Sequence, residues 1–311
     1  MSILEKLPSI IRKHQLGSEI KTYQIIQELW SGYGVLARVQ TDSHQFVIKQ
    51  ISFPDNVSHP KGHDSLFAHE RKVKSYQVEM SFYANYQEHR GISHTPELVA
   101  ISNETDNYLI LEDLQSLGFK PKREISVSEI ELCIKWLAGF HYTYLAARPK
   151  NLWNTGTYWH LETRPQEFQI MRDGPLKEYA ELVDQKLSSA NYQTILHGDA
   201  KLANFLFSED RVSAVDFQYC GGGVGVKDLA YFLSSVFNEE ELFGSEKEIL
   251  DLYFHELFCL GAREELIESW RGLYPYAWFD FYRFLAGWSP DHYKINKYIK
   301  TQMNKVLDEI N

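Results

Sequence analysis

The feature that most constrains this chain is the stretch 194–218, in which polar side chains stand at the ends of short apolar runs. A first apolar run ends at His197-Gly198-Asp199, and Asn204 follows just before a second run. A polar turn leads to a third run, residues 212–215, which ends at Asp216. This pattern predicts a β-hairpin that carries two carboxylates and one amide in its loops.

These three side chains suit phosphoryl transfer. Mg²⁺ takes oxygen ligands from few protein groups and leaves room for phosphate oxygens, so Asn204 and Asp216 are candidate metal ligands. Asp199 is then free to accept the proton of an attacking hydroxyl as the catalytic base. The alternative is a plain polar hairpin in which Asp216 caps a turn.

The spacing of these residues resembles the catalytic core of small-molecule kinases. The resemblance rests on His197-Gly198-Asp199, on Asn204 after four further residues, and on Val215-Asp216-Phe217-Gln218. That family includes choline, aminoglycoside and ecdysteroid-type kinases and is similar in fold to protein kinases. The text VDFQYCGGGVGVKDLAYFL, residues 215–233, is most similar to the ecdysteroid-kinase-like branch. The resemblance covers roughly residues 20–290.

The resemblance implies an α+β, protein-kinase-like fold with two lobes. Residues 1–113 are expected to form a nucleotide-binding lobe, a small antiparallel sheet with one long helix. Residues 114–311 are expected to form a larger, mainly helical catalytic and substrate lobe. The chain of 311 residues is long enough for two cores. Asp113 and Gln115 lie where the family has its hinge, which reads adenine through backbone groups.

Two glycines and one lysine in the N-terminal part are candidate nucleotide ligands. Gly32 and Gly34 lie in a turn between two strand-like runs, where glycine lets backbone approach a phosphate; a plain hairpin turn is the alternative. Lys49 lies in the apolar run Phe46–Lys49 and matches the kinase lysine that pairs with ATP phosphates.

That lysine needs an acidic partner on a nearby helix. The helical run from about residue 65 to 87 offers Glu79, which matches the family's glutamate, with Glu70 and Glu88 as competing choices. A surface ion pair is the alternative for the Lys49–Glu79 pair. Three histidines, His59, His63 and His69, lie before this helix or at its start, but their spacing matches no standard zinc site, so a mobile loop near the nucleotide is favoured over a metal site.

Departures from protein kinases indicate a small-molecule substrate. Gly198 replaces the arginine that would read a phosphorylated activation loop. Only eleven residues separate Asp216 from Asp228, which is too few for a peptide-docking platform. Asp228 matches the family's aspartate that braces the catalytic loop. Lys201 matches the lysine near the transferred phosphate and is assigned to charge stabilisation, with a solvated lysine as the alternative.

The C-terminal part offers candidates for acceptor binding. Residues 148–168 are loop-like and dense in polar and aromatic side chains, and His160 and Arg164 are the candidate substrate contacts there. Asp280 is a further candidate in an aromatic-rich segment, residues 270–288, which is typical of core but also of a cation–π cage. Residues 221–225 are predicted to form a flexible bend.

Composition excludes some classes of function. The net charge of −10 argues against nucleic-acid binding. No apolar run is long enough for a membrane span, the N-terminus does not look like a signal peptide, and the three scattered cysteines suit reduced cytosolic thiols. We therefore expect a cytoplasmic protein without membrane or nucleic-acid partners, and the oligomeric state stays open.

The sequence thus predicts an ATP- and Mg²⁺-dependent phosphotransferase that acts on a hydroxyl of a small molecule, most readily an apolar or choline-like alcohol. ATP and GTP are not distinguished. An aminoglycoside phosphotransferase is the first alternative. A catalytically inert, kinase-fold nucleotide-binding protein is the second, and it is disfavoured because every residue that the chemistry requires is present.

Overall fold

The computed structural model describes residues 3–29, 32–53, 66–87, 93–104 and 106–310. The chain divides into two compact units. Unit 1 comprises Met1–Glu88 and Thr95–Lys120, and unit 2 comprises His89–His94 and Pro121–Asn311. An antiparallel sheet dominates unit 1 and helices dominate unit 2, as predicted. The assignment of residues 1–113 to nucleotide binding and of residues 114–311 to catalysis stays a prediction.

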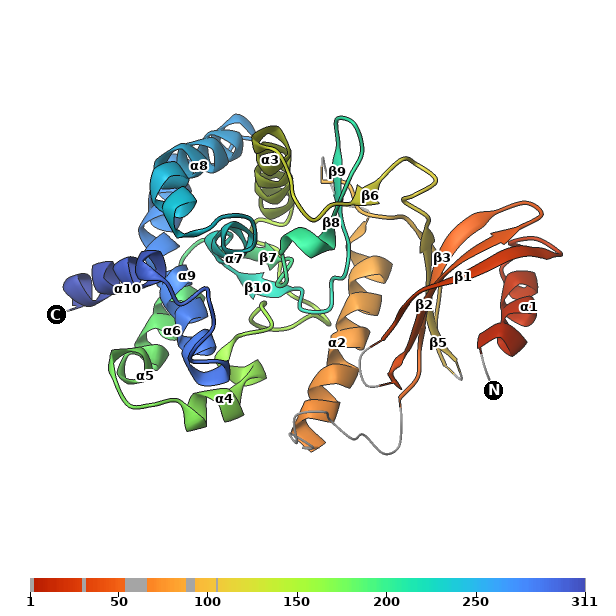
Figure 1. Cartoon of the computed structure of the whole chain (residues 1–311), viewed down its shortest axis with the longest axis horizontal. Helices are drawn as coiled ribbons and strands as arrows, with labels where there is room; N and C mark the ends of the chain where they lie inside the picture. The colour runs from red at the N-terminus through yellow and green to blue at the C-terminus, as the bar shows by residue number, and fades with distance from the viewer. Residues whose placement is uncertain (1–2, 30–31, 54–65, 88–92, 105, 311) are drawn as a thin grey trace. The chain divides into compact units, whose positions relative to one another are not determined.

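Unit 1 is built on a five-stranded antiparallel sheet with strand order β1-β2-β3-β5-β4 (Figure 1). The strands are β1 (Ile20–Glu28), β2 (Gly34–Thr41), β3 (Gln45–Ile51), β4 (Leu98–Asn103) and β5 (Asn107–Glu112). Successive side chains of a strand point to opposite faces of the sheet. Phe46 and Ile48 of β3 therefore pack with α1 (Ile3–Lys13), whereas Lys49 points to the opposite face, where it meets α2 (Leu66–Asn85).

Unit 2 is mainly helical (Figure 1). Its helices are α3 (Val127–Thr143), α4 (Pro165–Ile170), α5 (Pro175–Glu178), α6 (Ala180–Ser188), α7 (Val226–Val236), α8 (Glu239–Cys259), α9 (Glu264–Trp288) and α10 (Lys297–Ile310), with 3-10 turns η3 (Leu161–Thr163) and η4 (Leu202–Asn204). Helix α3 begins at a capping box formed by Ser126 and Glu129, which satisfies two otherwise unpaired backbone amides. It packs against α7 and α8 and buries nine of its residues.

Short strands hold the loops of unit 2. They are β7 (Thr194–Leu196), β8 (Phe205–Phe207), β9 (Val212–Ala214) and β10 (Gly221–Gly223), and β6 (Lys120–Pro121) lies where the chain passes from one unit to the other. Strands β8 and β9 form the predicted hairpin, and β7 pairs antiparallel with β10. The catalytic candidates stand at the ends of three of these strands: Asp199 and Lys201 follow β7, Asn204 directly precedes β8, and Asp216 follows β9.

The prediction of a flexible bend at residues 221–225 is wrong for its first half. Gly221–Gly223 form β10, and the glycines serve close packing. A Cβ atom on Gly221 would lie 2.3 Å from the carbonyl oxygen of Trp153, and one on Gly223 would lie 2.4 Å from Cδ1 of Leu196. The Trp153 oxygen is a backbone atom, so Gly221 is required by the chain that crosses here, whereas a Cβ atom on Gly223 would displace the end of the Leu196 side chain.

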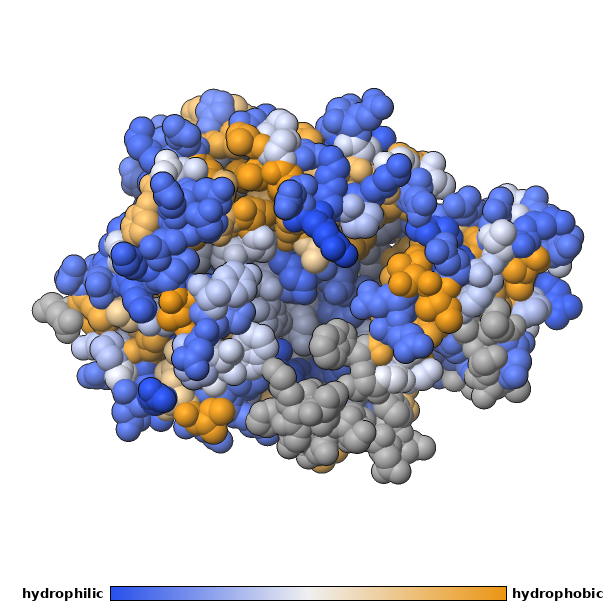
Figure 2. Space-filling view, in the orientation of Figure 1, coloured by the Kyte–Doolittle hydropathy of each residue, from blue (hydrophilic) through white to orange (hydrophobic). Residues whose placement is uncertain are grey.

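The face of the molecule seen in Figure 2 is mainly hydrophilic, with apolar side chains gathered over α3 and α8. Val127 of α3 and Phe258 of α8 are among the exposed apolar residues. None of the helices in the described ranges is long and apolar enough to cross a bilayer. Cys133, Cys220 and Cys259 are free thiols, the first two of them buried.

Candidate active site

The loop after β7 places a buried carboxylate with one unbonded oxygen. Asp199 is 7% exposed. Its Oδ2 atom accepts hydrogen bonds from Nζ of Lys201 at 2.9 Å and from Nδ2 of Asn204 at 3.0 Å. Its Oδ1 atom is buried and has no hydrogen-bond partner among the described residues. A buried carboxylate oxygen without a donor is costly, so a free Oδ1 indicates a site for a ligand that donates a hydrogen bond.

Burial and neighbouring charges shift the pKa values of Asp199 and Lys201. Burial raises the pKa of Asp199 above its usual value, the Lys201 ammonium works against that rise, and the Asp216 carboxylate adds to it. Burial acts to lower the pKa of Lys201, but Asp199 and Asp216 outweigh it and raise that pKa. Lys201 therefore keeps its positive charge beside Asp199, where it can balance negative charge on a transferred phosphate.

A hydrogen bond between backbone groups holds together the two segments that carry the predicted metal ligands. The amide of Val215 donates to the carbonyl oxygen of Asn204 at 3.0 Å, which fixes Asp216 next to the Asn204 loop. Asp216 has φ 70°, a left-handed conformation that aspartate adopts more readily than most residues. Sparsely populated backbone conformations of this kind cluster at functional sites, where they fix the position of a side chain.

The donor set fits Mg²⁺. The Asn204 side chain donates two hydrogen bonds from Nδ2, one to the Asp199 backbone oxygen and one to Asp199 Oδ2. Its amide oxygen is therefore left for a cation. One amide oxygen and one carboxylate are hard ligands that leave most coordination positions to phosphate oxygens and water. The described residues hold no cluster of three or more His, Cys, Asp or Glu side chains that would form a metal site by itself.

Asp228 at the start of α7 fixes the loop that leads to Asp199. Its carboxylate accepts hydrogen bonds from the backbone amides of His197 at 2.6 Å and Gly198 at 3.0 Å. His141 of α3 lies 3.2 Å from the same carboxylate and 2.8 Å from the Tyr253 hydroxyl, as expected of a core histidine. Two amides held by one buried carboxylate orient the loop that ends in Asp199, which agrees with the bracing role expected for Asp228.

Gly198 permits this arrangement. Its φ is +79°, and a Cβ atom there would lie 1.9 Å from the carbonyl oxygen of Tyr219. An arginine at this position, as protein kinases carry, would therefore displace the backbone. His197 next to it supports the same fold, because Nε2 bonds the Val215 carbonyl at 3.0 Å and Nδ1 accepts from the Asp199 amide at 3.2 Å. Burial lowers the pKa of His197, so the ring is neutral and serves as a scaffold.

In unit 1 the structure brings Lys49 and Glu79 together. The Lys49 ammonium lies 2.6 Å from Oε2 of Glu79, and both residues are buried. The ammonium also lies 5.5 Å from the ring centroid of Tyr76. Of the competing acids, Glu70 is exposed and Glu88 lies outside the described residues, as does the segment with His59 and His63. The burial of this pair disfavours a surface ion pair, while its contact with phosphates stays a prediction.

The other predicted nucleotide ligands of unit 1 are placed as follows. Gly32 is exposed, and Gly34 packs so closely on β3 that a Cβ atom would lie 2.0 Å from the Gln50 carbonyl oxygen. Asp113 is buried, and its carboxylate accepts hydrogen bonds from Arg38 at 2.7 Å and from the exposed Gln115 backbone at 3.2 Å. Gly34 and Asp113 thus have structural roles, and nucleotide contact stays a prediction for all four positions.

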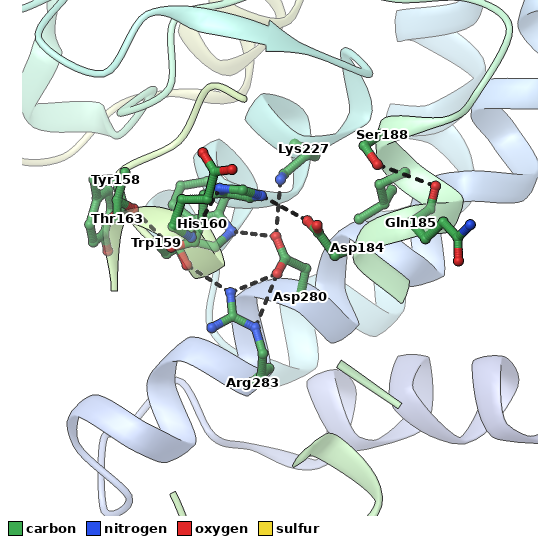
Figure 3. Close-up of polar contacts among 12 residues, drawn as sticks. Tyr158, Trp159, His160, Thr163, Asp184, Gln185, Ser188, Lys227, Asp280 and Arg283 are labelled. Atoms are coloured by element: carbon green, nitrogen blue, oxygen red, sulfur yellow. Dashed lines mark hydrogen bonds and ion pairs between the residues drawn. The ribbon is translucent and has the colours of Figure 1, made fainter. Parts of the chain in front are cut away.

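The predicted substrate residue Asp280 lies in a buried charge cluster (Figure 3). Its Oδ2 lies 3.0 Å from Nζ of Lys227 and accepts a hydrogen bond from Nε1 of Trp159 at 3.1 Å, and its Oδ1 accepts from Nη2 of Arg283 at 2.7 Å. Although burial acts to raise it, the two cations hold the pKa of Asp280 below its usual value. Both oxygens are engaged within the protein, and direct contact with a substrate stays a prediction.

His160 and Arg164, the other two substrate candidates, also bond within unit 2. His160 is 3% exposed, and its Nε2 atom lies 2.8 Å from Oδ1 of Asp184 (Figure 3). Arg164 donates from Nε to the Tyr158 carbonyl oxygen at 3.0 Å and from Nη1 to Glu167 at 3.2 Å. These contacts pack the loop predicted at residues 148–168, which contains η3 and α4, and substrate contact stays untested for both residues.

Three residues that sequence reasoning missed interact with Asp199 or with the loop that carries it. The backbone amide of Tyr158 donates to the Gly198 carbonyl oxygen at 3.1 Å. Tyr231 of α7 is adjacent to Asp199: burial first, and then that carboxylate and the Tyr158 hydroxyl, raise the pKa of Tyr231. Lys294 lies over the Tyr231 ring at 5.3 Å. Helical spacing from Asp228 gives a signal for Tyr231, three residues further on, but no local pattern marks Lys294.

Most of the aromatic residues between 270 and 288 are core. Trp270, Tyr274, Tyr276, Trp278, Phe279 and Phe281 are at most 2% exposed. Trp278 packs against Tyr298 of α10 with ring centroids 5.1 Å apart, and Trp288, 45% exposed, stacks on Phe284. The core interpretation, left open by the sequence, therefore holds for these six residues.

Comparisons with known proteins agree with this geometry. The family model described as the ecdysteroid kinase-like family matches residues 35–152 and 153–262. No match was found among the curated proteins. Similar solved structures include the choline kinase LicA from Streptococcus pneumoniae (14% identity, 99% of this chain and 98% of that chain covered, TM-score 0.51).

Two further solved structures are similar over nearly the whole chain. A choline kinase from Cryptosporidium parvum is 13% identical, with 98% of this chain and 94% of that chain covered and a TM-score of 0.54. A protein assigned to the aminoglycoside phosphotransferases, from Ralstonia eutropha, is 13% identical, with 96% and 95% covered and a TM-score of 0.56. At these identities the likeness shows the fold alone, and it confirms the predicted α+β, protein-kinase-like class.

Proposed function

The chain belongs to the ecdysteroid kinase-like family, and from that premise we propose that it is an ATP-dependent kinase of a small-molecule alcohol. The observation that carries the proposal is the buried Oδ1 atom of Asp199, which has no hydrogen-bond partner in the described ranges, while Lys201 is bonded to the other oxygen. A carboxylate held in this way can accept the proton of a hydroxyl that lies against Oδ1.

The proposed reaction uses the residues of unit 2 as follows. The acceptor hydroxyl passes its proton to Oδ1 of Asp199, its oxygen forms a bond to the γ-phosphorus of ATP, and the bond from that phosphorus to the bridging β,γ-oxygen breaks to release ADP. Lys201 balances charge on the transferred group. Asn204 and Asp216 hold Mg²⁺, which when bound neutralises phosphate charge. In this chemistry, positioning and charge neutralisation supply most of the rate.

Lys49 is proposed to bind the α- and β-phosphates, with Glu79 fixing its position. We expect Lys49→Met to raise the Kd for MgATP about ten- to a hundredfold, on the scale of a lost charged hydrogen bond. Isothermal titration calorimetry measures this, with Lys21→Met as a control, because Lys21 is an exposed lysine of the same unit. Since Lys49→Met removes the cation beside the buried Glu79 carboxylate, the double variant Lys49→Met, Glu79→Leu separates misfolding from lost binding. Unchanged affinity in the double variant would contradict the role.

The acceptor is proposed to be an alcohol without multiple amines, in contrast to a polycationic sugar. Of the three carboxylates that residues 148–168 and 270–288 could offer, Asp280 is engaged by Lys227 and Arg283, and Glu162 is exposed. Glu167 is bonded to Arg164 through Oε1, and its buried Oε2 has no hydrogen-bond partner among the described residues. The aromatic residues of segments 148–168 and 270–288, taken alone, would suit either an apolar alcohol or a choline-like quaternary amine. The positive charge of Lys294 distinguishes between these two classes of acceptor.

A screen of acceptors with ADP release as the readout tests the proposed activity. We expect turnover with apolar alcohols and little or none with kanamycin, because a polycation needs several free carboxylates and finds few. Kanamycin turnover with a micromolar KM would favour the aminoglycoside alternative. MgATP binding without transfer to any alcohol would favour an inert nucleotide-binding protein. The cytoplasm, where ATP and reduced thiols are found, is the proposed location.

A further inference from the structure

Lys294 is a cation without an acidic partner among the described residues. It lies in the segment between α9 and α10, and its Nζ atom donates to Oγ of Ser234 at 3.1 Å. Its ammonium lies 5.3 Å from the ring centroid of Tyr231 and 5.7 Å from that of Phe281. No ion pair within the described ranges includes Lys294. One hydrogen bond leaves the other N–H groups of the ammonium able to donate to a ligand.

The position of Lys294 links it to the catalytic loop through α7. Tyr231, under the ammonium, is adjacent to the Asp199 carboxylate. Ser235, next to the Ser234 that binds Lys294, accepts a hydrogen bond from the Leu202 amide of the loop at 2.9 Å. The charges of Lys201 and Asp199 both reach the Lys294 ammonium. Lys294 therefore faces the region where an acceptor hydroxyl would meet Asp199.

The aromatic faces in this region are already covered by protein cations. Tyr231 packs against Trp159, with centroids 4.8 Å apart, and against Phe281, at 5.2 Å. Lys294 lies over Tyr231 and Phe281, and Lys227 lies 6.0 Å from the Trp159 ring centroid. A quaternary amine would have to compete for these ring faces against two ammonium groups of the protein, and like charges repel it.

Positive charges also outnumber negative charges among the buried groups near these rings. Lys227 and Arg283 share the single carboxylate of Asp280, and all three residues are at most 2% exposed. Nη1 of Arg283 is buried without a hydrogen-bond partner among the described residues. Around the Trp159–Tyr231–Phe281 rings, the described part of the chain places the cations of Lys227, Arg283 and Lys294 against the carboxylates of Asp280 and Asp199. The Asp199 carboxylate is already bonded to Lys201, so the balance stays positive. Such an excess of positive charge favours a negatively charged ligand.

We propose that Lys294 is a specificity-determining residue of the acceptor site, which favours an alcohol that carries a carboxylate and rejects quaternary amines. This inference rests on the proposed kinase activity and narrows its acceptor class. Lys294 would donate to the carboxylate of the acceptor while the hydroxyl of the same molecule meets Asp199. Of the two acceptors that the aromatic residues alone would allow, the choline-like one is thereby excluded.

Three probes of one shape test the proposal: p-(hydroxymethyl)benzoate, its neutral amide, and the p-(hydroxymethyl)phenyl trimethylammonium ion. Binding to the full chain is measured by calorimetry with a non-hydrolysable MgATP analogue present, and kcat/KM is measured with MgATP. We expect the benzoate to bind roughly tenfold or more tightly than the amide, and the cation more weakly than the amide, as the sign of the Coulomb interaction requires. Equal binding of the benzoate and the amide overturns the proposal, whether or not turnover occurs.

Charge variants assign the preference to this one side chain. Lys294→Glu should reverse the order of the probes, and Lys294→Met should remove the preference without reversing it. Lys300→Glu, an exposed lysine of α10, makes the same change of net charge and should keep the wild-type order. If Lys300→Glu also reverses the order, the preference comes from net charge and the proposal fails. Thermal melting confirms that each variant is folded, and MgATP binding by the variants shows that a lost preference is not a lost nucleotide site.

The pH dependence provides a second readout. Burial, and then the Lys201 charge, lower the pKa of Lys294 to about 8, while Asp199 works against this shift. The benzoate preference should therefore be full below about pH 8 and fade as the ammonium loses its proton above it. Of the groups that face Lys294, Lys201 and Tyr231 have raised pKa values, and that of His292 is lowered, so they hold their charge state through this range.

Arginine stays charged at all these pH values, so Lys294→Arg should keep the preference above that pH. A wild-type preference that does not change with pH would overturn the role of Lys294. The outcomes also separate this proposal from the activity on which it rests. If the wild type transfers phosphate without regard to acceptor charge, the specificity proposal fails and the kinase stands. If it binds no MgATP and transfers no phosphate, the kinase itself fails.

Discussion

Replacing Asp199 with Asn is expected to lower kcat by about a hundredfold or more, which is the scale of a lost general base. The variant keeps the shape of the side chain, and its amide oxygen can still accept from Lys201, so the loop should keep its fold. What it loses is the buried Oδ1 carboxylate atom that we propose takes the proton of the acceptor hydroxyl. MgATP binding should survive, because Asn204 and Asp216 remain. Steady-state kinetics and calorimetry on the same preparation measure both quantities.

A matched control for this variant is Asp210→Asn in the exposed turn between β8 and β9. It removes the same charge at a position outside the catalytic loop, and we expect its kcat to equal that of the wild type. Thermal melting of both variants excludes unfolding as the cause of a loss. Turnover of Asp199→Asn within a few-fold of the wild type would show that Asp199 is not the base.

The hairpin and the proximity of its candidate residues could be predicted from the sequence because their geometry is local. Asp199, Lys201 and Asn204 lie within six residues, and their mutual hydrogen bonds follow from one short loop. The strands that hold the loop are short apolar runs with polar ends, which the alternation of residue types reveals. Lys49 and Glu79 are thirty residues apart, but a lysine in an apolar strand needs a buried acid, which limits the choice of partner.

The acceptor region could not be predicted in the same way, because its contacts join distant parts of unit 2. Asp280 meets Lys227, fifty-three residues earlier, and Lys294 meets Ser234, sixty residues earlier. No periodicity encodes which buried acid will be neutralised and which cation will be left unpaired. The sequence showed an aromatic segment that suited either a core or a cation cage, and burial decides for the core in most of it.

The glycines show a second reason why sequence patterns are ambiguous. Glycine permits a bend, but it also permits two backbones to pass closely, and the sequence is the same in both cases. At Gly221 and Gly223 the second use applies, because Trp153 and Leu196 occupy the space of the missing side chains. Only the position of the crossing segment, which for Trp153 is distant in the sequence, distinguishes the two uses.

The second large effect is expected at Asp216. Asp216→Ala should abolish measurable Mg²⁺-dependent ATP binding together with turnover, because the metal loses its charged ligand and an uncompensated triphosphate then faces the Asp199 carboxylate. Titration of ATP with and without Mg²⁺ measures this, and affinity that is the same in the variant and the wild type would make Asp216 a turn residue.

The backbone at this position calls for a second variant. Since Asp216 has φ 70°, alanine also adds strain of roughly 1–2 kcal/mol, which could by itself disturb the loop. Asparagine tolerates the same backbone, so Asp216→Asn removes the charge while it keeps the turn and one oxygen ligand. We expect this variant to melt like the wild type and to bind MgATP much more weakly. A loss of binding in Asp216→Ala that Asp216→Asn does not share would assign the residue to the backbone turn, whereas a loss in both assigns its carboxylate to the metal.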